Sequence, residues 1–424
     1  MYRLREMHDR RPKTEDGRRN IKSLFFVAIL SVISFSVCAQ AELNYQTVED
    51  SSYALYLKKD WKGLEQFGRL AIKNKIDYFY LRERIGIAYY EQKKYQLALP
   101  HFQKAYGFNS GDELLQEYLF YSHVFNYQYD QALHLTKKFS PELKTKTYTT
   151  KPAAINMVQL DFTAKIPELS SIAYPYYFFG FGFNHRITRG YSAFHAYSFS
   201  RQKYNRGIYD QHRYYLSVNI PLVKGFSLIP AFSILADQYK DTLFYPPPPP
   251  PMRPPPPSLR TRTYLSYIGS LNVSMALPYV KVDLGNAFSN LDTTYQIQHA
   301  LALTVYPLAN QKLFIGATGI LYTNNYYSSV KPLVQAVVGF NAPQFFRMSV
   351  VYTYANIYNF HLYNGYWVQN GYDLLRHNVT ASPEFIIKHR FSIYAAYQLE
   401  LKTTRTTQTN YIAHGVSFGT KLRF

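Results

Sequence analysis

The sequence offers few side chains whose types and spacing could support covalent chemistry. It contains one cysteine, Cys38, and no HExxH, G-x-S-x-G or phosphate-loop motif. The remaining acid–base candidates are scattered carboxyl and imidazole groups: Asp210, His212, Asp237, Asp241, His361 and His377. Because connecting loops are polar in any protein, such a group does not by itself define a catalytic site. We therefore predict no catalytic residues, no enzymatic activity, no cofactor and no metal site.

A second set of ionisable residues follows a stricter pattern. Each falls on the polar face of a segment that alternates with period two: Lys281, Asp283, Arg347, Glu384, Glu400, Lys421 and Arg423. In a membrane-spanning barrel a lipid-facing charge at the midplane would cost roughly 2–4 kcal/mol, so these side chains are expected to face the lumen. There they would either fill the interior as a salt-bridge network or line a conduit. Tyrosines on the same faces would add flat surfaces for sugars: Tyr215, Tyr264, Tyr306 and Tyr394.

The elements that must position these residues are strands between residues 154 and 424. Alternating segments of about ten residues are typical of a transmembrane β-barrel. We count fourteen: 155–163, 173–185, 190–201, 210–221, 225–237, 262–276, 279–289, 294–306, 311–322, 330–340, 344–356, 374–386, 389–401 and 410–424. An even number of strands places the beginning of the first strand and the end of the last strand on the same side of the membrane. Twelve and sixteen strands remain open, because the first strand has the weakest pattern.

The last of these strands has a pattern of its own. A polar residue, a glycine two positions later and two large apolar residues occur as Ser417, Gly419, Leu422 and Phe424. This pattern resembles the assembly signal of bacterial outer-membrane barrels. The resemblance implies insertion by the barrel-assembly machinery and contact with outer-membrane lipid. The alternative is an ordinary terminal strand of a soluble β domain.

Composition is compatible with a barrel and excludes other classes. Aromatic residues make up 18% of the chain, with 43 Tyr and 30 Phe against 2 Trp, as suits lipid-facing strands with aromatic girdles. The mean hydropathy of −0.27 argues against a helical membrane protein. The net charge of +20 would suit nucleic acid, an anionic membrane surface or an anionic polymer. Because the basic residues are dispersed and the chain is expected to be exported, we predict no nucleic-acid partner.

Residues 1–41 are predicted to be a signal peptide. Arg18, Arg19 and Lys22 precede an apolar run at 24–37, and Ala39-Gln40-Ala41 matches a cleavage site. Cys38 is a poor match to a lipoprotein signal. Export would place the next domain in the periplasm.

Residues 42–140 are predicted to be helical and repetitive. Aromatic-x-x-apolar positions recur every 34 residues, the period of tetratricopeptide repeats. The predicted helix pairs are 46–58 with 61–73, 78–91 with 95–107, and 112–125 with 129–139. The resemblance implies packing roles for Trp61, Leu64, Ile85, Gly86, Tyr89, Tyr95, Ala98, Phe102, Ala105, Tyr129 and Ala132. An unrelated helical bundle is the alternative. Residues 141–153 are polar and predict a linker.

A proline-rich run lies within a predicted extracellular loop at 237–261. Pro246–Pro251 and Pro254–Pro257 favour an extended polyproline II segment. Such a segment would serve either as a spacer or as a recognition arm.

The expected fold is thus an all-α tetratricopeptide-repeat solenoid followed by an antiparallel transmembrane β-barrel at 154–424. This order resembles exopolysaccharide exporters of the cellulose and poly-N-acetylglucosamine type, the surface lipoprotein assembly modulators (Slam) and the YaiO-like barrels. The resemblance implies an outer-membrane export or surface-assembly component whose helical domain recruits a periplasmic protein or polysaccharide cargo. We expect the barrel to conduct or place envelope polysaccharide. Translocation of surface lipoprotein or protein, and a non-conducting scaffold, are the alternatives.

Overall fold

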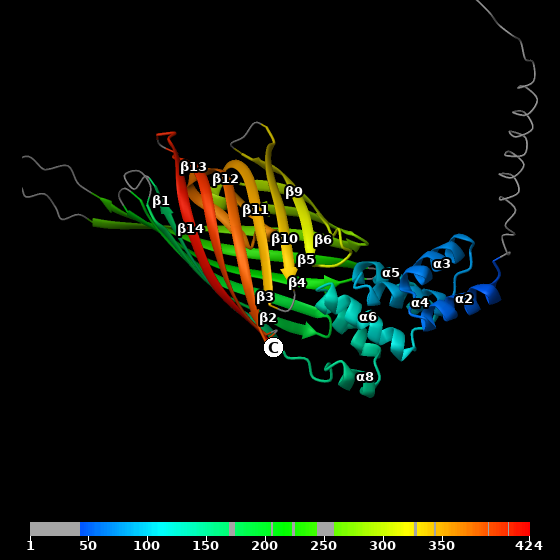
Figure 1. Cartoon of the computed structure of the whole chain (residues 1–424). Coiled ribbons are helices and arrows are strands. Elements are labelled where there is room, and N and C mark those ends of the chain that lie inside the picture. The colour runs from blue at the N-terminus through cyan, green and yellow to red at the C-terminus, as the bar shows by residue number, and fades with distance from the viewer. Residues whose placement is uncertain are drawn as a thin grey trace, which may run out of the picture.

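The computed structural model describes residues 43–168, 174–204, 207–222, 225–243, 258–325, 329–342, 345–388, 390–405 and 407–424. The predicted signal peptide at 1–41 and the proline-rich run at 246–257 lie outside these residues. Within them the chain forms seven α-helices followed by fourteen strands (Figure 1). We call the part that contains the helices the helical domain.

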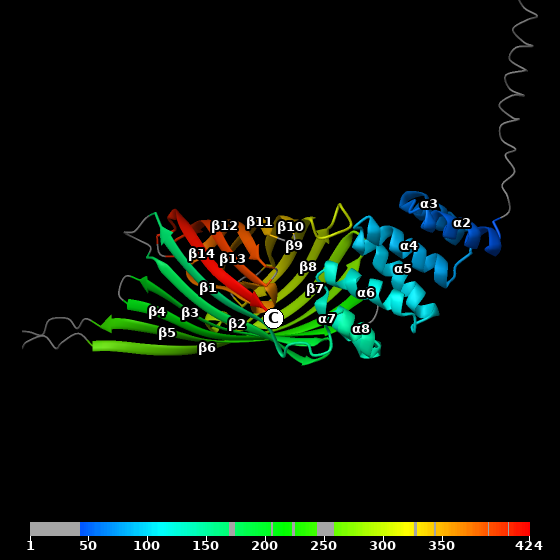
Figure 2. The same ribbon diagram turned by 60° about the horizontal axis from the view of Figure 1, so that its bottom comes forward.

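The helices of this domain are antiparallel neighbours joined by short turns (Figure 2). They are α2 (Tyr45–Leu57), α3 (Trp61–Lys73), α4 (Phe79–Glu91), α5 (Tyr95–Phe108), α6 (Glu113–Phe125) and α7 (Tyr129–Leu135), the last continued by η1 (Thr136–Lys138). Asn44, Asp60 and Asp112 cap α2, α3 and α6 by accepting a hydrogen bond from a backbone N–H of the first turn. These bounds lie close to the predicted helix pairs, whereas membership in the tetratricopeptide family stays a prediction.

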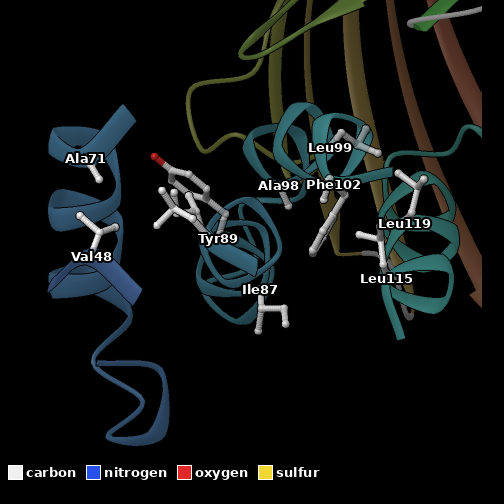
Figure 3. Close-up of a cluster of buried hydrophobic side chains, with 12 residues drawn as sticks. Val48, Ala71, Ile87, Tyr89, Ala98, Leu99, Phe102, Leu115 and Leu119 are labelled. Carbon is white, nitrogen blue, oxygen red and sulfur yellow. The ribbon is translucent and has the colours of Figure 1, made fainter. Parts of the chain in front are cut away.

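The core of the helical domain lies where α2, α3, α4, α5 and α6 meet (Figure 3). A Cβ atom on Gly86 would lie 2.4 Å from the ring of Phe102, so the glycine permits the close approach of α4 to α5. The other repeat residues that are buried in this domain are Leu64, Ile85, Tyr89, Ala98, Ala105 and Ala132.

Three aromatic repeat residues occupy less buried places. Trp61 packs partly buried against Tyr56, and Tyr95 stacks on Phe125 with ring centroids 4.6 Å apart. Tyr129 differs from its expected packing role because it is 48% exposed. This exposure goes with a short α7, only seven residues long, which contacts the barrel strands β3 and β4.

The predicted linker at 141–153 is not entirely irregular. It contains α8 (Pro141–Lys146), which Ser140 caps by accepting a hydrogen bond from the N–H of Leu143. Leu143 packs with Phe120 and Phe139. The polar composition of the segment concealed this helix because it is only six residues long and buries a single face.

The fourteen strands form one closed antiparallel barrel, which confirms the predicted strand number. Each strand pairs with its sequence neighbours, and β1 pairs with β14 from Met157–Arg423 to Pro167–Ala413, which closes the sheet. The strands are β1 (Ile155–Pro167), β2 (Tyr176–Thr188), β3 (Tyr191–Tyr204), β4 (Gly207–Pro221), β5 (Phe226–Leu243), β6 (Ser258–Leu277), β7 (Val280–Ser289), β8 (Gln296–Val305), β9 (Leu313–Asn324), β10 (Lys331–Ala342), β11 (Phe346–Leu362), β12 (Trp367–Ile387), β13 (Phe391–Thr403) and β14 (Asn410–Arg423).

The outer surface of the barrel is apolar on every strand. Large exposed side chains include Phe162 on β1, Tyr214 on β4, Leu301 on β8 and Phe418 on β14. A water-soluble protein rarely exposes so continuous an apolar surface, whereas lipid requires one. Among the described residues, no helix combines the length and apolar character needed to cross a bilayer.

Two predicted loops are shorter than expected. In the segment predicted as a loop at 237–261, β5 continues to Leu243 and β6 begins at Ser258, with main-chain pairing up to Leu243–Ser258. In the segment between the predicted strands 344–356 and 374–386, β11 reaches Leu362 and β12 begins at Trp367. The sequence criterion failed here because these strand ends lose the alternation of apolar and polar residues while they keep their backbone hydrogen bonds.

The predicted assembly-signal residues occupy both faces of β14. The Ser417 hydroxyl lies 2.8 Å from that of Thr163 on β1, and Leu422 and Phe424 are exposed on the outside. A Cβ atom on Gly419 would lie 2.2 Å from the Tyr394 ring, so this glycine makes room for a tyrosine of β13. The N–H of Phe424 donates to the carbonyl of Asn156 and extends the closing strand pair.

Candidate functional site: the barrel lumen and its mouth

The barrel has two distinct ends. One, here called the proximal end, contains the start of β1 and the end of β14 and contacts the helical domain (Figure 1). The other, the distal end, contains the β5–β6 extension (Figure 2). The inner faces of the strands and the helices at the proximal end together form the candidate site.

A cavity of about 780 Å³ occupies the lumen. Its lining extends from Tyr127 and Gln311 at the proximal end to Lys165 and Gln202 near the distal end. Its charged lining residues are five cations and two carboxylates: Lys165, Arg213, Arg347, Lys402, Lys421, Asp161 and Glu384. We call this space the lumen cavity. The excess of cations favours an anionic or electron-rich occupant.

The first group of predicted charges lies toward the proximal end. Glu384 lies between Arg347 and Arg423, with N–O distances of 3.7 and 3.8 Å. The ammonium of Lys421 lies 4.8 Å from the ring centroid of Tyr394. One carboxylate therefore pairs with both arginines, and the long N–O distances leave the guanidinium groups able to donate hydrogen bonds to further acceptor atoms.

A second charged group lies toward the distal end. Glu400, whose side chain is 0% exposed, forms salt bridges with Lys165 and Lys402, with N–O distances of 2.5 and 3.0 Å. Asn378 donates a further hydrogen bond of 3.2 Å to the same carboxylate. Lys165 also lies over the rings of Tyr176 and Trp367. Glu400 is thus neutralised, and one positive charge of the pair of lysines remains uncompensated within this group.

Part of the lumen is filled by the tip of the β11–β12 hairpin. The turn η4 (Tyr363–Gly365) folds inward, and the Ser270 hydroxyl on β6 donates to the carbonyl of Asn364 at 3.1 Å. Gly365 has a φ of +84°, which a side chain would strain, and an added Cβ would meet Ile268. The hairpin narrows the barrel, so the lumen cavity follows the wall formed by β9–β14 and β1–β4.

The next residue of the turn, Tyr366, reaches the opposite wall. Its hydroxyl accepts a 2.6 Å hydrogen bond from Gln159 on β1, and its ring lies 5.9 Å from the guanidinium carbon of Arg213 on β4. Arg213 also donates to Ser198. These contacts fix the hairpin tip across the lumen and place an aromatic face beside a cation.

The helical domain reaches the barrel mouth at three proximal turns. Asp130 on α7 accepts hydrogen bonds from Ser192 on β3 and Asn219 on β4. The amide of Asn310, after β8, donates to the carbonyl of Lys93 at 3.0 Å. Arg189, between β2 and β3, donates to Thr136 at 3.3 Å. Contacts on several turns hold the helices against the mouth.

One helical-domain residue enters the lumen itself. Tyr127 lies in the turn between α6 and α7 with a φ of +59°, and its ring lies 5.0 Å from the guanidinium carbon of Arg347. It lines the lumen cavity and also a second space of about 420 Å³ between the helices and the barrel mouth. We call the second space the junction pocket. Tyr127 therefore lies between the lumen cavity and the junction pocket.

The remaining predicted lumen residues lie in several places. Lys281 lines the junction pocket and pairs with Asp283 at 2.9 Å. Of the four predicted inward tyrosines, Tyr394 lines the lumen cavity and Tyr306 the junction pocket. Tyr215 packs beneath Tyr366. Tyr264 pairs with Asp237 and so lies on the inward face of β6, where it is 37% exposed near the distal end.

Burial shifts the pKa of several groups in the helical domain, among them His123 and Glu83. Burial lowers the pKa of His123 to about 4, although a hydrogen bond to Gln128 opposes this shift. Burial raises the pKa of Glu83 to about 7, and the negative charge of Asp112 adds to the rise. His123 is therefore neutral at neutral pH and acts there as a hydrogen-bonding core residue.

The scattered acid–base candidates do not come together. His212 and His377 lie on the outer surface, where each contacts a tyrosine hydroxyl. Asp210 pairs with Arg201 and Lys240, and Asp241 pairs with Arg262. Asp237 and His361 are buried inside. In the part of the chain that the structure describes, no group of three His, Cys, Asp or Glu residues could hold a metal ion.

Sequence reasoning missed several site residues. Lys165 lies on β1 beyond the predicted end of that strand at 163, and Lys402 lies one residue beyond the predicted end of β13. Continued period-two counting from Asp161 and Glu400 would have reached both. Tyr127 had no such signal, because its role depends on how the helices dock on the barrel.

The chain resembles several solved barrels only distantly. No protein-family model and no curated protein matches the sequence. A FadL homologue of Pseudomonas aeruginosa matches with 8% identity and a TM-score of 0.42, covering 64% of this chain and 90% of that one. The toluene transporter TbuX of Ralstonia pickettii matches with 8% identity and a TM-score of 0.43, again covering 64% and 90%. The KdgM porin matches with 8% identity and a TM-score of 0.30, covering 63% of this chain and 99% of the porin.

Proposed function

We propose that the chain is an outer-membrane export component that passes envelope polysaccharide through, or places it by way of, the barrel lumen. The membrane location is supported by the closed fourteen-strand sheet and by the large apolar side chains on the outside of every strand. A closed barrel leaves no unpaired backbone groups toward lipid.

The proximal end is the periplasmic end in this proposal. The helical domain precedes the barrel and contacts its proximal turns, and the predicted signal peptide would deliver it to the periplasm. The long β5–β6 extension would then project outward from the cell.

The observation that carries the proposal is the lining of the lumen cavity. Cations outnumber carboxylates there by five to two, and the rings of Tyr176, Tyr366 and Tyr394 share the same space. Cations attract the carboxylates of acidic sugars, while aromatic faces support the apolar faces of sugar rings. A hydrophobic substrate would gain little from such a lining, because each charge would be desolvated without a partner.

The helical domain supplies a recruiting surface in this proposal. Because Tyr127 lies at the boundary of the lumen cavity, cargo that approaches from the proximal side meets the helices before the lumen. The partner is either the polysaccharide itself or a periplasmic protein that carries it.

The test is current block in a planar bilayer. The purified full-length protein should give anion-selective currents that an acidic uronate oligosaccharide reduces from the proximal side. The variant Lys421→Ala should weaken this block, whereas Lys58→Ala, a change on the surface of the helical domain, should leave it unchanged. Currents that are cation-selective and insensitive to the oligosaccharide would contradict a polysaccharide conduit.

The strand number favours a second candidate, translocation of a surface lipoprotein or protein. A fourteen-strand barrel that follows a short helical domain resembles the architecture of the surface lipoprotein assembly modulators. Site-specific crosslinkers on the exposed face of the helical domain would distinguish the candidates. Capture of a lipoprotein rather than glycan would support the second.

A further inference from the structure

The junction pocket is unlike the lumen cavity in its chemistry. Its described lining contains one charged residue, Lys281, which Asp283 already pairs. Side-chain amides dominate instead: Gln96, Gln103, Asn126, Gln128, Gln131 and Gln311 among them. An amide both donates and accepts hydrogen bonds, as a sugar hydroxyl or acetamido group does.

Several of these amides lack partners in the described part of the chain. Asn126 is 5% exposed, and neither its Oδ1 nor its Nδ2 has a hydrogen-bond partner. The Oε1 of Gln96 and the hydroxyl of Tyr127 are also buried without a partner. Leaving a buried polar group unpaired is costly, so each such group needs a physical reason, and a ligand that completes the bonds supplies one.

The other walls of the pocket are flat and apolar. Two tyrosines line the pocket, Tyr127 from the helical domain and Tyr306 from the residue after β8. Leu99 and Pro278 add aliphatic surface. The volume of about 420 Å³ lies within the usual range of small-molecule sites. Polar amides around ring faces suit a hydroxyl-rich ring better than a lipid chain or an anion.

We propose that the junction pocket binds a short segment of neutral, hydroxyl- or acetamido-bearing oligosaccharide at the barrel mouth. This inference rests on the proposed function, because it assigns a first binding site to the neutral sugars of a cargo whose acidic sugars the lumen cations attract. Asn126 and Gln96 contact the sugar through their unpaired amide atoms, and Tyr127 and Tyr306 contact its ring faces. Tyr127 borders both spaces, so bound sugar lies next to the entrance of the lumen cavity.

The test is calorimetric titration of the full-length protein in detergent. The probes are a glucose tetrasaccharide, a β-1,4-linked N-acetylglucosamine tetrasaccharide, a uronate tetrasaccharide and a neutral glycine–serine peptide. One or both neutral sugars should bind, and the double variant Gln96→Ala/Asn126→Ala should bind them at least tenfold more weakly. Its melting temperature should not fall, because the Oε1 of Gln96 and both side-chain amide atoms of Asn126 have no hydrogen-bond partner among the described residues.

Two further variants complete the design. Gln46→Ala changes an exposed amide of α2 outside the pocket and should bind as the wild type does. Gln103→Leu changes a half-exposed amide of the pocket and should weaken binding, which keeps the test decisive if the double variant is unstable.

Three results would overturn the junction site. They are unchanged affinity for the neutral sugars in the pocket variants, no heat from either neutral sugar, and preferential binding of the peptide. Binding of the uronate alone, equal in wild type and variants, would also overturn it, while leaving a lumen conduit intact. Failure of the proposed function appears separately, as absence of block in the bilayer experiment.

Discussion

The guanidinium carbon of Arg347, on a barrel strand, lies 5.0 Å from the ring centroid of Tyr127, on the helical domain. The contact joins the two parts of the chain inside the mouth of the barrel. Because Arg347 is only loosely paired with Glu384 at 3.7 Å, the cation–π contact is a main constraint on its position. Movement of the helical domain would therefore change both the width and the charge of the entrance.

Gly419 should be indispensable for barrel formation. In Gly419→Val the new side chain would overlap the Tyr394 ring, and overpacking of this kind costs about 1–3 kcal/mol. We expect a smaller folded fraction, measured by heat-modifiable mobility on gels. Gly319→Val is the matched control, because a Cβ at Gly319 meets nothing within 4 Å. The double variant Gly419→Val/Tyr394→Ala should recover folding; if it does not, the tyrosine is not the cause.

Glu400 should be the most sensitive charge in the lumen. Glu400→Gln leaves Lys165 and Lys402 without their carboxylate in a site with 0% exposure, and breaking a buried pair in this way costs about 3–5 kcal/mol. Urea unfolding in lipid vesicles should show the loss. Asp241→Asn, in the more exposed pair with Arg262, is the comparison and should have a much smaller effect. Equal losses for the two variants would contradict this ranking.

Glu83 should make the helical domain less stable as the pH rises. Its pKa is raised from 4.5 to about 7 by burial, so the folded state holds a proton that the unfolded state releases above pH 4.5. The penalty is absent below pH 4.5, grows between pH 4.5 and 7, and is complete above pH 7. The buried histidines His101 and His123 act oppositely, since their lowered pKa values destabilise the fold as the pH falls from 6.5 toward 4.

The variant Glu83→Gln isolates the glutamate from these histidines. Its melting temperature, followed by the helical circular dichroism of the full-length protein, should exceed that of the wild type more at pH 8 than at pH 4. A difference between the two proteins that is constant with pH would show that Glu83 does not titrate in this range.

The sequence predicts strands and helices correctly where one physical constraint acts along a whole element. Period-two alternation predicts fourteen strands because one face of each meets an apolar surround and the other the lumen. The same alternation assigned Arg347, Glu384 and Lys421 to the faces that line the lumen cavity. On the distal part of β5 the environment of the two faces changes and the alternation is lost, so the strand end was predicted too early.

The partners of the lumen charges could not be predicted in the same way. Glu400 lies near Lys165 because β13 pairs with β14, which pairs with β1, and this closure links residues far apart in sequence. The inward turn at Tyr363–Gly365 likewise depends on the space that the other strands leave. Tyr127 acquires its place only when the helices dock, so no local pattern marks it.

The central claim is that the lumen is a conduit whose proximal entrance is bounded by Tyr127. Single-channel recording of full-length wild type, Tyr127→Ala and Tyr148→Ala tests it directly; Tyr148 is 90% exposed and serves as the control. Tyr127→Ala should give larger, anion-selective currents than wild type, because it removes the ring between the junction pocket and the lumen cavity, and Tyr148→Ala should match wild type. Currents that are absent in all three proteins would contradict the conduit and favour a non-conducting scaffold.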